Sequence, residues 1–452
     1  MLKLKSKQFV ALVGDFLMAG AALFSALTLR FFDIPGNERV MVHVELFAPL
    51  FVFLVILYYS FDFYDFSPFQ TRLRQFSRII NIHVFVALIG IGYFYTAGAY
   101  TGLTPKTVLV LYTIFHVVYA VMWRIFIMPQ MLRPQARQNT LLLAEGDEYE
   151  ELKHVVNQHS FYPFHFVEHI GSLPSDKEGQ QDLLLKLKRL FEDGEMTQVV
   201  VDIRDNRTAP YLSYLYTLAS QRKIHVFDAA MVYQDTLKKM PMRGVGHFWF
   251  FESVHLNIRT YEAAKRIVDI VIAIPWIIIW IILHPFVSLA IKLDSKGDIF
   301  IAQERYGFGG KVIKLYKYRT MTYSDKGMWL TEKDNPNKVT KVGYWLRKSR
   351  IDELPQLLSI MSGDLSLIGP RPDILAIGGQ LSATIPYYMM RYTVRPGLSG
   401  WAQVHQELPP QSLEETKVRL QYDLYYVKNR SLLLDFIILV KTFKVVVLRT
   451  GM

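Results

Sequence analysis

Four long apolar runs in the first third of the chain most restrict the folds available to it. They span residues 9–30, 42–60, 79–98 and 106–128, and each is close to the ~20 residues that a helix needs to cross a bilayer. The first run is too long for a signal-peptide core and lacks a convincing small-residue cleavage site, so we expect it to be retained. The sequence therefore predicts an integral membrane α-helical bundle of four helices over residues 1–132.

The basic residues around these runs indicate their orientation. Lysine and arginine gather before the first run, between the second and third, and after the fourth, whereas the two remaining loops carry little beyond Arg39 and Lys106. The clustered residues are Lys3, Lys5, Lys7, Arg72, Arg74, Arg78, Arg133 and Arg137. Because cytoplasmic loops carry such an excess, the N-terminus and everything after residue 130 are predicted to be cytoplasmic.

The chain as a whole is basic, with a formal net charge of +11. This charge suits an anionic partner such as a phospholipid surface or a phosphorylated substrate. There is no zinc-finger spacing and no recognisable nucleic-acid motif, so no nucleic-acid partner is expected. Asp15, inside the first run, would normally indicate function. Packing against a neighbouring span explains it at least as well, and we assign it no role.

A region of alternating short strands and polar helices follows the bundle. The expected strands lie in NTLLLAEG, FHFVEHIGS, TQVVVDIRD and KIHVFDA, with segments such as DEYEELKHVVNQ between them. This alternation predicts a small parallel α/β domain, Rossmann-like, over residues 139–235. The first strand ends in one glycine followed by acids, which opposes phosphate binding there. A structural or oligomerisation role is therefore favoured, a homodimer is expected, and residues 236–260 are expected to form a linker.

A fifth apolar segment, residues 265–293, is long enough to span a membrane. A simple crossing would place the strongly basic C-terminal third outside the cell, which opposes the charge rule. Pro275 and Pro285 each remove a helix hydrogen bond and favour a kink. We therefore predict a re-entrant helix that enters the cytoplasmic leaflet and returns, with Lys265 and Arg266 gripping the phospholipid surface. An ordinary fifth span is the alternative.

The stretch RIDELPQLLSIMSGDLSLIGPRP, residues 350–372, places two adjacent carboxylates among basic residues. Pro355 is tolerated only in the first turn of a helix, so the helix is expected to begin near Asp352. The helix dipole and nearby arginines should favour an ionised carboxylate, which can attack phosphorus and form an acyl phosphate. Asp352 and Glu353 point in different directions, so one is expected to attack and the other to position a metal or proton. Arg319, Arg371 and Arg395 would hold the phosphate.

Residues 261–452 resemble the bacterial sugar transferases, the polyprenol-phosphate phosphoglycosyl transferases with one membrane-associated catalytic domain. The matching segments occur in the expected order. They are Lys265-Arg266 with Asp269, KLDSKG, Gln303-x-Arg305-x-Gly307, KYRTM, DELPQL, GDLSLIGPRP, RPGLSGWAQV and YDLYYVKN. The four-span bundle with an α/β domain is similar to the large subgroup that begins exopolysaccharide, capsule or O-antigen synthesis.

This resemblance implies an α+β catalytic domain with a re-entrant helix on the cytoplasmic face of the bacterial inner membrane. The implied reaction converts a UDP-sugar and undecaprenyl phosphate into a polyprenyl-diphospho-sugar and UMP, by a ping-pong scheme. Asp352 would be the nucleophile, and Glu353 and Mg²⁺ would assist, with both carboxylates as metal ligands. Substrate-binding roles are implied for Lys317, Arg319, Arg371, Arg395 and Gln403. The chain departs from the family pattern at His284-Pro285, where Ser-Pro is common, and at Asn335-Pro336-Asn337-Lys338.

Two other functions remain open. A membrane-bound nucleotide-sugar dehydratase would share the four spans and the α/β domain, but it needs a glycine-rich dinucleotide loop after a strand. A Tyr-x-x-x-Lys motif, Tyr261 to Lys265, lies at a membrane entrance with no such loop upstream. A non-catalytic membrane scaffold of a polysaccharide synthesis complex is the second alternative, and it predicts that Asp352 has no effect on product formation.

Overall fold

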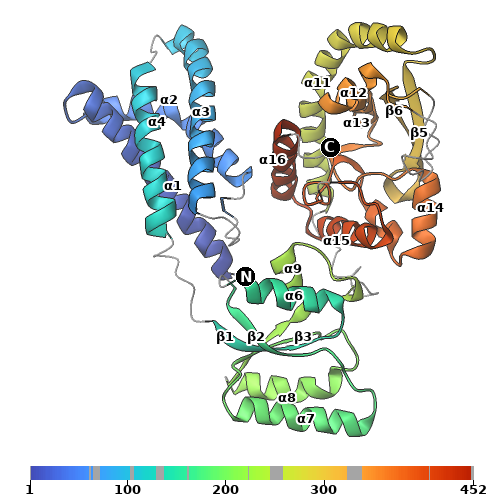
Figure 1. The fold of residues 1–452 in the computed structure, drawn as a ribbon. Helices are drawn as coiled ribbons and strands as arrows, with labels where there is room; N and C mark the ends of the chain where they lie inside the picture. Colours follow the sequence, from blue (N-terminus) through green and yellow to red (C-terminus); the bar gives the residue numbers. More distant parts are fainter. Residues whose placement is uncertain are drawn as a thin grey trace. The chain divides into compact units, whose positions relative to one another are not determined.

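The computed structural model describes residues 2–60, 63–64, 72–101, 106–128, 137–159, 162–221, 223–244, 258–322, 338–406 and 408–448. The chain divides into two compact units, Met1–Thr236 and Leu237–Met452, and each is described by itself. The first unit contains the apolar bundle and the α/β region (Figure 1). The second unit contains the acid pair. Most of the predicted linker, residues 245–257, lies outside the described residues.

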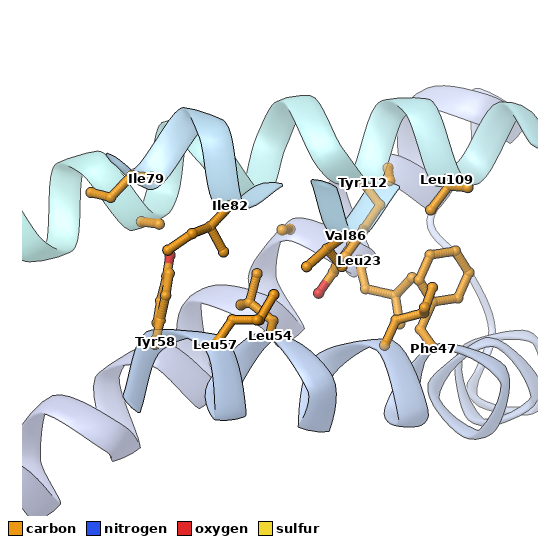
Figure 2. Packing of buried hydrophobic residues seen from close by; sticks show 14 of the residues in the cluster. Leu23, Phe47, Leu54, Leu57, Tyr58, Ile79, Ile82, Val86, Leu109 and Tyr112 are labelled. Carbon is orange, nitrogen blue, oxygen red and sulfur yellow. The ribbon is translucent and has the colours of Figure 1, made fainter. Parts of the chain in front are cut away.

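The four predicted apolar helices are confirmed. They are α1 (Leu2–Phe31), α2 (Asn37–Ser60), α3 (Arg72–Thr101) and α4 (Lys106–Val121), the last continued by the π-helical turn η1 (Met122–Ile127). Each contains or adjoins an apolar stretch long enough to cross a membrane. Figure 2 shows Leu54 and Leu57 of α2 packed near Ile82 and Val86 of α3, inside one buried cluster. Other large apolar side chains remain exposed on the outside of the helices, which suits a lipid environment.

A buried ion pair accounts for the acid in α1. Asp15 pairs with Arg124 of η1, whose Nε donates to Oδ1 at 2.9 Å and whose second nitrogen contacts Oδ2. The Tyr64 hydroxyl also donates to Asp15 Oδ2 at 2.7 Å, and Arg124 donates to the carbonyl of Phe63 at 3.0 Å. The packing explanation for Asp15 is thus confirmed. Its partner lies in the continuation of the fourth span, so the buried carboxylate is not left as an unpaired charge.

The α/β region follows the predicted alternation. Its elements are β1 (Gln138–Leu143), α6 (Asp147–Gln158), β2 (Phe164–Ile170), α7 (Lys177–Glu192), β3 (Gln198–Val201), α8 (Ala209–Ser220), β4 (His225–Asp228) and α9 (Ala229–Leu237). The strands are parallel, in the order β2-β1-β3-β4. Figure 1 shows α7 and α8 covering one face and α6 the other. Buried apolar runs in β1 and β3 are typical of a sheet covered on both faces.

The second unit is built around one long helix, α11 (Ile258–Asp294), and several short elements. Those that carry or support the site are the antiparallel strands β5 (Phe300–Tyr306) and β6 (Val312–Tyr318), helix α12 (Lys341–Ser349), the 3-10 helix η4 (Ile351–Gln356), α13 (Leu357–Ser362) and β7 (Ser366–Ile368). They are followed by α14 (Leu375–Thr384), the 3-10 helix η5 (Tyr388–Thr393), β8 (Gly397–Ser399), α15 (Leu413–Asn429) and α16 (Leu432–Leu448). The short helices η2 (Met242–Gly244) and η3 (Phe308–Gly310) complete the unit.

Helix α11 spans 37 residues and contains Pro275 and Pro285. Figure 1 draws it as a bent helix that rises along the unit and then turns across its top. Proline inside a helix is a common cause of such a bend. The bend is compatible with the predicted re-entry into one leaflet, and re-entry itself stays a prediction.

The basic pair at the start of α11 corrects one expectation. The Lys265 ammonium is buried and pairs with Asp435 at 2.9 Å, instead of reaching a phospholipid surface. Arg266 donates to the carbonyls of Ile360 and Met361, at the end of α13. A helix end leaves its last carbonyls without intrahelical partners, and Arg266 satisfies two of them. Both charges therefore fasten α11 to its own unit.

Candidate active site

The backbone that presents the acid pair turns at Arg350. This residue ends α12 in the left-handed conformation, with φ 58° and ψ 15°, and directly precedes η4. A side chain other than glycine rarely adopts this conformation, which costs on the order of 1 kcal/mol. Asp352 and Glu353 follow in the first turn of η4, with Pro355 behind them. The predicted helix start is confirmed, with 3-10 geometry that passes into α13.

Asp352 is a buried carboxylate, 8% exposed, and its Oδ1 has no hydrogen-bond partner among the described residues. Burial, followed by the negative charge of Glu353, raises the pKa of this carboxyl from 3.8 to about 6. The positive charges of Lys317, Arg350 and Arg347 oppose that rise without cancelling it. The nearby arginines thus favour the ionised form, as expected, but desolvation is the larger effect and gives a net rise in the pKa of Asp352.

Glu353 has the opposite environment. Its Oε1 accepts a hydrogen bond of 2.5 Å from Arg371 in an ion pair. Burial acts to raise the pKa of Glu353, but the charges of Arg371, Arg350 and Arg305 outweigh it and hold the pKa below its usual value. The two neighbouring acids are thus separated into one carboxyl that retains its proton more readily and one that is firmly ionised. Such separation is typical of acids with different chemical roles.

Two close loops bring Arg371 and Gln403 together. The Nη1 of Arg371 and the Nε2 of Gln403 both donate to the carbonyl of Leu398, at 3.3 Å each. The Oε1 of Gln403 is buried without a partner among the described residues. Strands β7 and β8 pair in parallel next to these loops, and a Cβ at Gly397 would overlap the backbone of Gly369. Glycine is needed there for the close approach.

Arg305 belongs to this cluster, although its sequence motif alone did not predict a place in the site. It donates to the carbonyl of Pro372 at 2.6 Å and to Gln303 Oε1 at 2.9 Å. Burial and the neighbouring charge of Arg371 lower the pKa of Arg305 to about 10. The Nε2 of Gln303 is also buried without a partner in the described part of the chain. The alternation Gln303-x-Arg305 on a strand was the available signal, since both side chains lie on one face.

The remaining predicted site residues lie in different surroundings. Lys317, on β6, contributes the largest of the positive-charge effects on Asp352. Arg319 is buried and donates to the carbonyls of Ser295 and Lys296, at 2.8 Å each, so it braces the loop after α11. Arg395 is half-exposed and lies 3.4 Å from Glu262 of α11. The structure therefore joins Lys317, Arg371 and Gln403 to the acid-pair region through described interactions, whereas substrate roles for Arg319 and Arg395 stay predictions.

Comparison with known proteins places this site in a family. Residues 260–449 match the family described as bacterial sugar transferase. The chain is 39% identical over 193 residues to a UDP-N-acetylgalactosamine-undecaprenyl-phosphate N-acetylgalactosaminephosphotransferase of Aeromonas hydrophila, across 42% of this chain and 45% of that protein. It is 39% identical over 183 residues to a UDP-glucose:undecaprenyl-phosphate glucose-1-phosphate transferase of Caulobacter vibrioides, across 40% of this chain and 68% of the relative.

A shorter relative is matched almost throughout. The exopolysaccharide production protein PSS of Rhizobium leguminosarum bv. phaseoli is 36% identical over 185 residues, which cover 39% of this chain and 92% of that protein. Longer relatives, such as the Aeromonas protein, are matched over less than half of their length. Each of these matches is shorter than the second unit, Leu237–Met452. The chain belongs to the bacterial sugar transferase family.

Proposed function

We propose that this chain transfers a sugar-1-phosphate from a UDP-sugar to undecaprenyl phosphate and releases UMP, as a first membrane step in exopolysaccharide, capsule or O-antigen synthesis. The observation that carries the proposal is the buried Asp352, whose Oδ1 has no partner among the described residues, close to the charges of Lys317, Arg347 and Arg350 and beside the Glu353–Arg371 pair. The names of the relatives give the reaction class, and they differ in the sugar.

The proposed chemistry proceeds in two displacements. The ionised Asp352 oxygen attacks the phosphorus that bears the sugar, a new P–O bond forms, and the bond to UMP breaks with its electron pair leaving on UMP. An oxygen of undecaprenyl phosphate then attacks the same phosphorus, and the Asp352 carboxylate leaves. With a pKa of about 6, Asp352 is largely ionised near neutral pH and yet poorly solvated, which suits a nucleophile. Arg371 and Lys317 would offset the charge that spreads over the phosphoryl oxygens.

The residues present fit a bound Mg²⁺ through Asp352. Among the described residues no group of three or more acidic or histidine side chains could hold a metal ion. Mg²⁺ often binds through one or two carboxylates together with substrate phosphates, and Asp352 Oδ1, which has no partner in the described part of the chain, would be such a ligand. Glu353 is already paired with Arg371, so it is less available as a ligand for Mg²⁺. The ion would neutralise part of the negative charge on the substrate phosphates.

The cellular setting is also part of the proposal. Within the described part of the chain, five helices are long and apolar enough to cross a membrane, and the charge pattern favours a cytoplasmic face for the catalytic unit. We propose the bacterial inner membrane as the location and a homodimer as the assembly, with the α/β region as the natural contact because it lacks a phosphate-binding loop.

The first experiment follows UMP release from purified protein in nanodiscs with Mg²⁺, undecaprenyl phosphate and a panel of UDP-sugars. Wild type is compared with Asp352→Asn and with Asp298→Asn, an exposed carboxylate before β5. The proposal expects UMP from one or few donors, lost only in Asp352→Asn. Without the lipid acceptor, a burst of at most one UMP per protein should appear, as a covalent intermediate requires. Full activity of Asp352→Asn would favour another nucleophile, and no UMP from any donor would favour the scaffold function.

A further inference from the structure

A buried cluster of charges lies behind Arg371, and the proposed chemistry does not use it. Its centre is Arg391, 1% exposed, which pairs with Asp373 and, at 2.6 Å, with Asp423 of the YDLYYVKN motif. Burying charged groups is costly, and well-packed apolar residues are often as stabilising as a buried ion pair. Stability alone is therefore a weak explanation for this buried cluster. Its hydrogen bonds to the rest of the site give a better explanation.

Those connections lead to the backbone of the loop that carries Arg371. The Nη2 of Arg391 donates to the carbonyl of Arg371 at 3.0 Å. The hydroxyl of Tyr392 donates to the carboxylate of Asp373 at 2.6 Å and accepts from the backbone N–H of Asp373 at 3.2 Å. The carbonyl of Asp373 accepts from the N–H of Tyr306 at 3.1 Å. The peptide groups around Arg371 are thus held by this cluster and by β5.

We infer that Arg391, with Asp373 and Tyr392, is a positioning group that sets the backbone of Arg371, so that its guanidinium meets Glu353 and the phosphate of the donor. The inference rests on the proposed function, because it assigns Arg371 to the phosphate. Arg371 reaches Glu353 through a single 2.5 Å contact and Leu398 through a longer one, so a small rotation of its peptide would misdirect the side chain. Misplacement of about 1 Å costs up to a hundredfold in rate.

Two tyrosines offer a matched pair for the test. Tyr388 and Tyr392 are both buried and both donate to Asp373 Oδ2, at 2.7 and 2.6 Å. Only Tyr392 also accepts from the Asp373 backbone. Tyr392→Phe therefore removes one of the bonds that hold the loop backbone. Tyr388→Phe removes a hydroxyl that accepts from Arg391 Nη1 at 2.6 Å and makes no bond to that backbone among the described residues.

The experiment measures kcat/KM for the UDP-sugar by UMP release in a double-mutant cycle with Arg371→Lys, using the full chain in nanodiscs. Tyr392→Phe is expected to lower kcat/KM about fivefold, the value of one hydrogen bond, with Tyr388→Phe under about twofold. In the Arg371→Lys background Tyr392→Phe should have almost no further effect, because the group it positions is already lost. Arg391→Lys should behave like Tyr392→Phe with a larger loss, since a lysine cannot reach Asp373, Asp423, the Tyr388 hydroxyl and the Arg371 carbonyl together.

Each outcome of this experiment supports or contradicts the positioning role. An equal loss from Tyr392→Phe in both backgrounds would overturn the positioning role while leaving the transferase function intact. If the wild type releases no UMP, the proposed function fails first. Should Arg391→Lys fail to fold, as judged by its Tm, the two tyrosine variants still complete the cycle.

Discussion

Replacing Asp352 by Asn is expected to stabilise the folded protein above pH 6, although it removes the proposed nucleophile. The side chain is 8% exposed, and burial together with Glu353 raises its pKa from 3.8 to about 6. This difference of about 2 pH units corresponds to about 3 kcal/mol between the protonated and the ionised carboxyl. Because the folded pKa is the higher one, the favourable contribution is present below about pH 4 and is lost as the pH rises through about 6.

Asparagine does not ionise, so the variant avoids that loss. The free energy of unfolding of Asp352→Asn, relative to wild type, should therefore increase by up to about 3 kcal/mol between about pH 4 and pH 7. Tm can be followed from tryptophan fluorescence at a series of pH values, in nanodiscs without substrate or Mg²⁺, with Asp298→Asn as the exposed control. A difference between Asp352→Asn and wild type that does not change with pH would refute the reasoning, and so would a variant that is less stable at every pH.

Three further predictions follow from the same site. The acid limb of kcat/KM should fall near pH 6, and it should move to lower pH in Glu353→Gln and to higher pH in Lys317→Met, since these remove charges that raise and lower the pKa of Asp352. If the acid limb shifts in neither variant, it reports the titration of a group other than Asp352. Arg350→Gly should be more stable than Arg350→Ala by about 1 kcal/mol in thermal unfolding, because glycine adopts the left-handed conformation without strain, and equal stability would contradict this. Arg371→Lys should lower kcat/KM for the UDP-sugar by at least about tenfold, because a lysine lacks the planar guanidinium that contacts Glu353 with one nitrogen and the Leu398 carbonyl with another, and full activity would argue against it.

The acid pair and its arginine could be predicted because their positions depend on local signals. Asp352, Glu353 and Pro355 lie in one helical turn, and glycines mark the close loops near Arg371. Apolar length was enough to predict the four helices of the bundle, and alternation was enough to predict the parallel sheet.

Other features depend on distant contacts that no local pattern reveals. The number of arginines near Asp352 is visible in the sequence, but its burial is not, and burial decides the direction of its pKa. Arg391 gave no signal of its own, since its partners Asp373 and Asp423 come from separate elements. Lys265 was expected at the lipid surface for the same reason, because its partner Asp435 lies on the last helix.

The ion pair between Asp15 and Arg124 has a consequence for how the bundle is made. The two residues are 109 positions apart in the chain. At a synthesis rate of about 5–20 residues per second, Arg124 is added roughly 5–20 s after Asp15. During that time the first helix carries a carboxylate whose insertion into lipid costs about 3 kcal/mol at the helix centre. The first helix of the bundle is thus completed by the fourth, and we expect the bundle to close only when η1 has been synthesised.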